Sequence, residues 1–326
     1  MGAAYSALAN DAYAATLNPG GLGFLDSTQF AGQHLSYLDS MHYEYLSAVV
    51  PLGKAPSTEE RGSGLGFSAQ YLGSGDITGT DGSGAPTGNY SSYYSAYNLS
   101  YGRSFANQFS AGVTGKWINA KIEDVSANAF AADLGGMYRV SDRLTLGSVL
   151  ANMGSKLKFL NQSDSLPLAF HLGAAYRPAA PWLMSVEGVY PQTGLASAHF
   201  GLEWHPIPML ALRTGYRTDT VTGLGALAGF TTGLGLQAMG MEFSYAWVPM
   251  GDLGDTHYFS LVLRLGEPAE EKRNLIQYRA IKLQRVVRGD KDASEPEFQQ
   301  LMELLSHEDT DTAAAQAAPS PKSGAN

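Results

Sequence analysis

Residues 239–248 read MGMEFSYAWV, and this stretch decides the fold. Its odd-numbered positions hold large apolar side chains, and its even-numbered positions from 240 to 246 hold Gly, Glu, Ser and Ala. Because successive side chains of a β-strand point to opposite faces, the alternation predicts a strand with one apolar face and one small or polar face. Such strands build membrane-spanning β-barrels, whose outer side meets lipid and whose inner side lines the lumen.

The same unit recurs from about Thr28 to Leu265, separated by short turns rich in Gly, Asn, Asp or Pro. In residues 197–205, Ala198, Phe200, Leu202 and Trp204 alternate with His199, Gly201, Glu203 and His205. We count about fourteen such units, near 28–38, 42–51, 64–73, 93–103, 108–119, 128–139, 143–153, 167–177, 181–190, 197–205, 209–217, 226–236, 239–248 and 255–265. An even number of strands of about 9–11 residues is typical of a closed bacterial barrel. The sequence therefore predicts an all-β fold, a transmembrane antiparallel barrel of about fourteen strands.

Composition excludes several classes of protein. Only 16% of the 326 residues are charged, against about 25% in soluble domains. No run of about 18 apolar residues exists, which excludes a transmembrane helix. The net charge of −9 argues against nucleic acid as a partner. The chain has no Cys, as is common in proteins that avoid disulfide chemistry.

A water-soluble β-sandwich or propeller would show similar alternation, with the apolar faces forming a core. Against it, large aromatic residues lie near the strand ends, where the aromatic girdles of a membrane barrel are expected: Trp117, Tyr138, Tyr176, Trp182, Trp204, Tyr216 and Trp247. The opposite faces carry Gly, Ser, Ala and scattered charges, which suits a packed lumen better than a solvated surface. The membrane barrel is the favoured interpretation.

Three regions break the pattern of strands. Residues 73–90 are rich in Gly, Ser, Thr and Asp, and are expected to form one long external loop. After residue 266 the alternation stops, and apolar residues at near-helical spacing predict two helices within 267–307. Residues 308–326 have the composition of a disordered acidic and Ala-Pro tail. The predicted domains are an N-terminal plug (1–27), the barrel (28–266), a helical periplasmic extension (267–307) and the tail (308–326).

The plug is predicted from residues 2–24, which read GAAYSALANDAYAATLNPGGLGF. Small residues favour a closely packed helix over Ala3–Ala15, which Asn18-Pro19 would end, because a residue before Pro disfavours helical backbone. Gly20, Gly21 and Gly23 would then allow a tight turn into the first strand. A surface helix leading into a soluble domain is the alternative.

This N-terminal stretch resembles the opening of the PorV-like and FadL-like outer-membrane barrel proteins, which belong to the TodX superfamily. Their motif corresponds here to Asn10, Asp11, Asn18, Pro19, Gly20, Gly21 and Leu22, with Gly20 standing where Ala is usual and Asn10 where Asp is usual. The run GDTH at 254–257, leading into the last strand, resembles the PorV side. The resemblance covers about residues 2–266 and implies an N-terminal hatch in the barrel, a bacterial outer-membrane location and an export signal already removed, since none is visible in residues 1–24.

The two sides of the resemblance imply different functions. The PorV side implies a protein-binding component of a type IX-like secretion assembly. The FadL side implies a channel for long-chain fatty acids or other hydrophobic compounds, with Leu22, Phe24 and Leu25 where the plug meets the wall. We rank assembly first, because external loops are short apart from residues 73–90 and because short lone helices are marginal in water. An inert barrel that anchors a functional tail is a third possibility.

The predicted partners are membrane lipid, envelope proteins bound through the tail and barrel rim, and a hydrophobic ligand in the lumen. The partner-binding residues of the tail would be its apolar stripe: Leu275, Tyr278, Ile281, Phe298, Leu301 and Leu305. No cofactor is expected.

No catalytic constellation stands out, and the protein is not expected to be an enzyme. The ionisable residues predicted to face the lumen are Lys116, Asp133, His171, Arg177, Glu187, His199, Glu203, His205, Arg213, Arg217, Glu242 and Arg264. Because an isolated buried charge is costly, they are expected to form a network that seals the lumen and holds the hatch. His199, Glu203 and His205 lie on one strand face, but alternate residues of a strand are about 7 Å apart, too far for a compact metal site.

Overall fold

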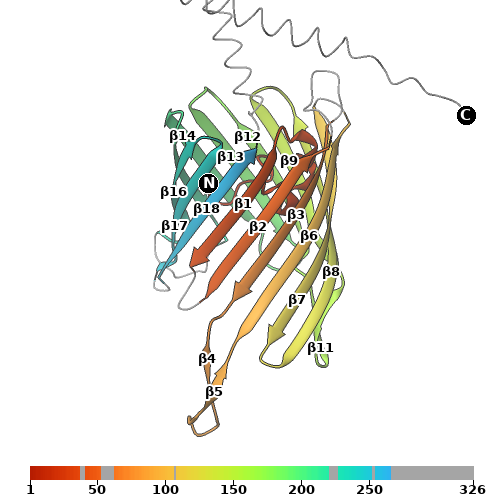
Figure 1. Ribbon diagram of the computed structural model, residues 1–326, viewed down its shortest axis with the longest axis vertical. Helices are drawn as coiled ribbons and strands as arrows, with labels where there is room; N and C mark the ends of the chain where they lie inside the picture. The colour runs from red at the N-terminus through yellow and green to blue at the C-terminus, as the bar shows by residue number, and fades with distance from the viewer. Residues whose placement is uncertain (37–40, 53–61, 106–107, 220–226, 252–253, 266–326) are drawn as a thin grey trace, which may run out of the picture. The chain divides into compact units, whose positions relative to one another are not determined.

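The computed structural model describes residues 1–36, 41–52, 62–105, 108–219, 227–251 and 254–265. Within these residues, fourteen antiparallel strands close into one barrel, because β1 pairs with both β2 and the last strand, β18 (Figure 1). The barrel strands are β1 (Thr28–Ser36), β2 (His42–Pro51), β3 (Ser63–Gly73), β6 (Ser92–Ser104), β7 (Phe109–Ile122), β8 (Val125–Arg139), β9 (Leu144–Gly154), β12 (Ala169–Tyr176), β13 (Trp182–Pro191), β14 (Ser197–Ile207), β15 (Leu210–Arg217), β16 (Phe230–Ala238), β17 (Met241–Pro249) and β18 (Asp255–Leu265). The fold class predicted from sequence is confirmed.

The region predicted as one long loop instead contains a two-stranded hairpin, β4 (Ile77–Thr80) with β5 (Pro86–Tyr90). A second hairpin, β10 (Lys156–Phe159) with β11 (Gln162–Ser165), lies between β9 and β12. Both hairpins consist mainly of exposed residues. Each of these four strands has only four or five residues, too few for the unit of about ten alternating residues that marks the barrel strands.

The two ends of the barrel differ. At the end where β1 begins and β18 ends, called the terminal end, residues 208–209 join β14 to β15 and Met239-Gly240 join β16 to β17. Met239 and Gly240 both have positive φ, 51° and 73°, as the two-residue hairpin turns that match strand twist require. The opposite end, called the hairpin end, carries both β4–β5 and β10–β11 (Figure 1).

The outer face of the barrel is apolar and cannot be a solvated surface. Leu46, Leu99 and Phe130 are each about two-thirds exposed, at 65%, 66% and 67%. Six of the seven aromatic residues predicted for the girdles are also exposed, namely Trp117, Tyr138, Tyr176, Trp182, Trp204 and Tyr216. Since exposed apolar surface of this extent needs an apolar solvent, the outer face is that of a transmembrane barrel. No helix in the described ranges is long and apolar enough to cross a membrane.

The core lies inside the barrel, between the wall and residues 1–27. Ala12, Ala14, Ala15, Leu22 and Leu25 pack there against Ala31, Tyr45, Val49 and Val262 of the wall. All nine are buried. The predicted tail helices and disordered tail fall outside the described residues.

Candidate functional site

Residues 1–27, called the N-terminal segment below, lie against the inward-facing residues of the barrel (Figure 1). They form one short α-helix, α1 (Ala14–Leu17), and one 3₁₀ helix, η1 (Pro19–Phe24). The helix predicted over Ala3–Ala15 was therefore wrong for all but its last two residues. The predicted stop at Asn18-Pro19 is confirmed, since α1 ends at Leu17 and Asn18 adopts an extended backbone.

The barrel wall supplies the hydrogen bonds that a longer helix would have made internally. Ser47 Oγ donates to the carbonyl of Ala12 at 2.8 Å, and Ser100 Oγ donates to the carbonyl of Ala15 at 2.8 Å. Because buried backbone groups must find partners, these wall hydroxyls stabilise an irregular backbone that would otherwise be costly.

Glycines on the inner face allow the segment to lie directly on the wall. A Cβ at any of nine wall glycines would come within 3.0 Å of an atom of the segment. These residues, called the glycine belt, are Gly64, Gly66, Gly102, Gly112, Gly135, Gly147, Gly173, Gly201 and Gly215. At Gly112 the new Cβ would lie 2.3 Å from the carbonyl oxygen of Pro19. The contact is between backbones, so it depends on the absence of side chains.

Asn18 is the most constrained residue of the predicted hatch motif. Its side chain is fully buried, and its amide Nδ2 donates to the carbonyls of Ser6 at 2.7 Å and Gly136 at 3.1 Å. Its Oδ1 accepts from the backbone N–H of Gly20 at 3.0 Å. Asn18 therefore ties together two parts of the segment and the wall.

The other motif residues act through packing. Pro19, Gly20, Gly21 and Leu22 are all buried in η1. A Cβ at Gly21 would collide with the backbone of Ala9, so this glycine allows the segment to fold back on itself. The tight turn predicted at Gly20, Gly21 and Gly23 takes the form of the 3₁₀ helix η1, in which these glycines have no positive φ and instead allow close approach.

Asp11 is held within the segment, whereas Asn10 is exposed. The Asp11 carboxylate accepts from the hydroxyl of Tyr5 at 2.5 Å and from the backbone N–H of Tyr13 at 2.9 Å. Burial raises the pKa of Asp11, although both hydrogen bonds oppose the shift. The Tyr13 ring stacks on Tyr45 of β2 with centroids 5.4 Å apart, which fixes this part of the segment against the wall.

Glu187 of β13 binds the segment from the opposite wall. Its Oε2 accepts from the backbone N–H groups of Tyr5 at 3.0 Å and Ser6 at 2.7 Å. Its Oε1 lies 2.9 Å from Nδ1 of His171 on β12. One wall carboxylate thus satisfies two backbone donors of the segment. The sequence predicted that Glu187 faces the lumen but did not predict this contact.

A chain of ion pairs occupies the inner face near the terminal end of β14, β15, β17 and β18. Arg213 contacts Glu203 at 2.6 Å and Glu242 at 2.7 Å, while Arg264 contacts Glu242 at 2.8 Å and His205 contacts Glu203 at 2.9 Å. These five residues are called the charged cluster. It confirms that these predicted lumen residues pair with one another.

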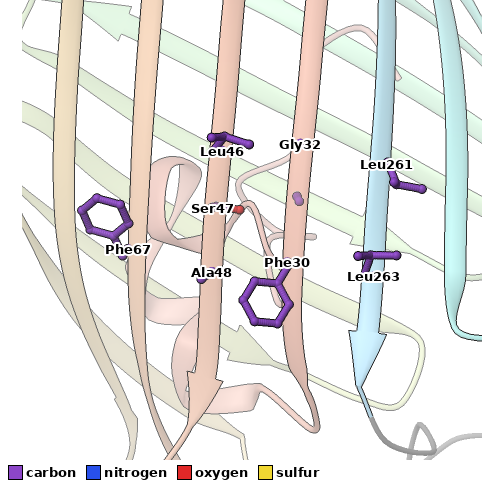
Figure 2. Close-up of a pocket in the computed structure, with 9 residues that line it drawn as sticks. Phe30, Gly32, Leu46, Ser47, Ala48, Phe67, Leu261 and Leu263 are labelled. Atoms are coloured by element: carbon purple, nitrogen blue, oxygen red, sulfur yellow. The ribbon is translucent and has the colours of Figure 1, made fainter.

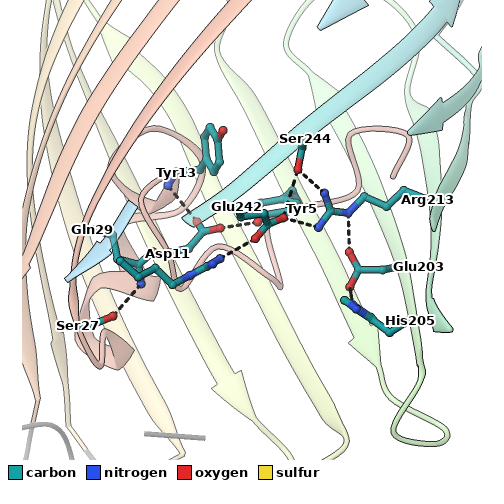
Figure 3. Close-up of polar contacts among 11 residues, drawn as sticks. Tyr5, Asp11, Tyr13, Ser27, Gln29, Glu203, His205, Arg213, Glu242 and Ser244 are labelled. Carbon is teal, nitrogen blue, oxygen red and sulfur yellow. Dashed lines mark hydrogen bonds and ion pairs between the residues drawn. The ribbon is translucent and has the colours of Figure 1, made fainter. Parts of the chain in front are cut away.

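The charged cluster lies beside the segment (Figure 3). Figure 3 shows Tyr5 and Asp11 next to Glu242, and the electrostatic effects of Arg264 and Glu242 on Asp11 have opposite signs. Within the described residues, the side-chain bonds of the cluster join wall residues to one another. The cluster therefore lies beside the segment and acts on it electrostatically, while its side-chain bonds are made within the wall.

Asp133 and Lys116 form a second ion pair, at 2.6 Å, where β8 and β9 shift register. Asp133 also accepts from the backbone N–H of Asn152 at 2.7 Å, and Lys116 donates to the Asn152 side chain at 2.9 Å. Asn152 has a positive φ of 64°. The pair thus stabilises a β-bulge in the wall. Of the predicted lumen residues, Arg177 differs, because it lies exposed in the turn after β12.

The structure does not bring His199, Glu203 and His205 together as ligands. His205 contacts Glu203, whereas His199 Nε2 lies 3.4 Å from Asp219 and 3.3 Å from the hydroxyl of Ser197. A Ser-His-Asp triad needs the acid and the serine on opposite imidazole nitrogens, and here both contact the same one. This trio therefore lacks triad geometry.

Two predicted sets of residues have different outcomes. The hatch-motif residues lie inside the barrel, with Asn10 the exposed one among them. The tail residues Leu275, Tyr278, Ile281, Phe298, Leu301 and Leu305 lie outside the described residues. Sequence reasoning missed the glycine belt, although glycines recurring on the face opposite the apolar one, such as Gly173 and Gly201, were its visible signal.

No protein-family model and no curated protein matches the chain. Among solved structures, the barrel is similar to the Ralstonia pickettii toluene transporter TbuX, at 12% identity over 78% of this chain and 94% of that chain, with a TM-score of 0.54. It is also similar to the Pseudomonas putida toluene transporter TodX, at 12% identity over 77% of this chain and 91% of that chain, with a TM-score of 0.51. The chain thus shares the barrel fold of these two toluene transporters.

Proposed function

We propose that this protein is a bacterial outer-membrane channel for hydrophobic compounds, and that residues 1–27 are the hatch that closes it. The observation that carries the proposal is the glycine belt. The wall has glycine wherever the N-terminal segment lies closest to it, so the lumen accommodates the segment as a plug. A plug implies a lumen that would otherwise be open.

The shared fold with two toluene transporters supports a channel over an assembly role, which was ranked first from sequence. The same likeness to outer-membrane-type barrels supports the proposed location. The contacts of the segment also suit a plug that moves. They combine backbone packing with a few hydrogen bonds, and the described chain holds no cysteine that would cross-link segment and wall.

A reversible cross-link tests the proposal. Thr16 Oγ1 of the segment lies 2.8 Å from Ser68 Oγ of β3, so cysteines at both positions would bring their sulfur atoms within bonding reach. The chain has no other Cys, so Thr16→Cys/Ser68→Cys would form a single disulfide. Uptake of radiolabelled toluene and of oleate is measured in cells that express each variant, before and after dithiothreitol.

We expect the oxidised double variant to lose uptake and to regain it on reduction. The two single-cysteine variants serve as matched controls and should take up both compounds in either redox state. Equal uptake by the oxidised and reduced double variant would show that the segment does not gate the lumen. Uptake of neither compound by the wild-type protein would contradict the channel itself for these two classes.

The assembly role stays a prediction, because the tail residues on which it rests lie outside the described residues. Isolation from membranes in mild detergent, with and without residues 268–307, tests it separately. A stoichiometric protein partner that is lost with the deletion would support it.

A further inference from the structure

The two faces of the barrel wall differ in what they leave without a partner. The outer face carries a groove of about 390 Å³ lined by apolar side chains such as Phe30, Leu46 and Leu261, and the chains of membrane lipids suffice to fill it (Figure 2). The inner face carries buried polar atoms, which need hydrogen-bond partners. On the inner face of β14, the Nδ1 atom of His199 is buried and has no hydrogen-bond partner among the described residues. Such an atom raises the free energy of the structure that contains it.

The other ring nitrogen of His199 has partners. Its Nε2 lies 3.3 Å from the hydroxyl of Ser197 and 3.4 Å from Asp219. Asp219 is itself paired with Arg217 at 2.6 Å, so the hydroxyl of Ser197 can donate to Nε2 and the ring proton then lies on Nδ1. In this tautomer, Nδ1 is a buried donor without an acceptor.

Glu187 is the carboxylate placed to accept from this donor. The strand register pairs Glu187 of β13 with His199 of β14, and both side chains are buried on the inner face. Directly opposite residues of an antiparallel pair have Cβ atoms about 5 Å apart. With the segment docked, however, Oε2 of Glu187 accepts from the backbone N–H groups of Tyr5 and Ser6. Its Oε1 lies 2.9 Å from Nδ1 of His171, so Glu187 is directed away from His199.

Withdrawal of the segment would reverse this arrangement. Glu187 would lose two donors at once and keep only its contact with His171. A lumen that holds a hydrophobic compound offers little water to replace these donors, and a carboxylate without sufficient partners is costly there. The Nδ1 donor of His199 can replace them, and the same contact satisfies His199 itself.

We propose that His199 is a positioning residue of the open state, in which its Nδ1 donates to Glu187 in place of the segment. The closed state holds one unpaired donor at this position, and the open state holds none. His199 therefore favours release of the segment, whereas the bonds from Tyr5 and Ser6 to Glu187 favour docking. The inference rests on the proposed function, because it requires that residues 1–27 move.

The test measures hydrogen exchange at the amides of Tyr5 and Ser6 in the purified full chain in detergent. Both amides donate to Glu187, so they exchange when this contact breaks. In His199→Asn the side-chain amide nitrogen can take the place of Nδ1, whereas in His199→Gln it can take the place of Nε2. His199→Phe removes both nitrogens. His171→Phe is the matched control, because it removes an imidazole that contacts Glu187 in both proposed states. A heat-modifiability gel checks that each variant folds.

Failure of this proposal and failure of the channel are distinguishable. Exchange reports movement of the segment whether or not a compound crosses the lumen, so the order of the variants decides the role of His199. Uptake of toluene and oleate by the wild-type protein decides the channel.

We expect His199→Gln and His199→Phe to slow exchange of both amides about tenfold, because the open state loses a hydrogen bond to a charged group. His199→Asn and His171→Phe should exchange at nearly the wild-type rate. If His199→Phe fails to fold, the comparison of His199→Gln with His199→Asn decides. The reverse order, with His199→Gln like the wild type and His199→Asn altered, would assign the role of His199 to its Nε2 contacts. That order, equal exchange in all the proteins, or faster exchange in His199→Gln would each overturn the proposal.

Discussion

The glycine belt and the charged cluster meet on the same strands but close the lumen in opposite ways. On β14, Gly201 of the belt comes two residues before Glu203 of the cluster, and on the antiparallel β15 Gly215 of the belt comes two residues after Arg213 of the cluster. The belt makes room for a separate stretch of backbone. The cluster fills the space with the wall's own side chains. One surface is therefore built to be occupied by the N-terminal segment, and the other closes without it.

The two surfaces also differ in the forces that hold them. Belt contacts are short-ranged packing, so they tolerate changes in salt and fail when any side chain is added. Cluster contacts are ion pairs with low exposure, so they depend on the identity of each partner. Substitutions that act on one surface alone can separate the two.

The largest expected effect is loss of the central cation of the cluster. Arg213→Met leaves Glu203 and Glu242 facing each other without their shared partner, and should lower the free energy of unfolding by about 3 kcal/mol. Denaturant unfolding in detergent, followed by tryptophan fluorescence, measures the change. Arg213→Lys keeps the positive charge, so its free energy of unfolding should lie between those of the wild-type protein and Arg213→Met. A loss for Arg213→Met no larger than that for Arg213→Lys would show that charge pairing is not what holds this surface.

A smaller effect is expected from adding a side chain to the belt. In Gly112→Val the new carbons meet the backbone of Pro19, which should destabilise docking of the segment by about 2 kcal/mol. The matched control is Gly115→Val on the outer face of the same strand, where the Cβ meets nothing within 4 Å. Limited proteolysis of residues 1–27 reports docking. If both variants are cleaved at the wild-type rate, close backbone packing does not hold the segment.

The smallest effect concerns pH. Burial raises the pKa of Asp11 above its ordinary value of 3.8, so the docked segment takes up a proton more readily than the undocked one. This contribution to docking is fully present below pH 3.8 and is lost as the pH rises through the raised pKa. One pKa unit corresponds to about a tenfold change in the docking equilibrium.

Hydrogen exchange at the amides of Tyr5 and Tyr13, corrected for its intrinsic pH dependence, measures this shift. Protection should be greater at the acidic end of the range than at neutral pH. Asp11→Asn should remove this difference in protection between acidic and neutral pH. The variant leaves the charged neighbours Glu242 and Arg264 in place. An identical slope in Asp11→Asn would assign the pH dependence to another group.

The barrel could be predicted from sequence because a wall between two solvents imposes a period of two on every strand. Residues 239–248 show the period clearly, and all fourteen predicted units correspond to barrel strands. The strands of the hairpins β4–β5 and β10–β11 have only four or five mainly exposed residues, so any alternation in them is too short to be recognised. What the alternation reports is the environment on each face, not the strand itself.

The site was less predictable, because its structure depends on contacts between distant residues. A run of small residues over Ala3–Ala15 favours a helix in isolation, yet Ser47, Ser100 and Glu187 satisfy its backbone from the wall. Ionisable lumen residues could be recognised from their strand face, but their pairing depends on register across strands. Asn18 was chosen by resemblance, and only the fold shows that it bonds to both Ser6 and Gly136.

The short connection between η1 and β1 limits how far the N-terminal segment could move. Only residues 25–27 separate Phe24 from Thr28, the first residue of the barrel. An extended chain covers at most about 3.6 Å per residue, so the end of η1 must stay within about 14 Å of the first residue of β1. The segment could not leave as one body while the barrel stays intact. Opening would therefore be a swing of the free portion before Asn18, with η1 acting as the pivot.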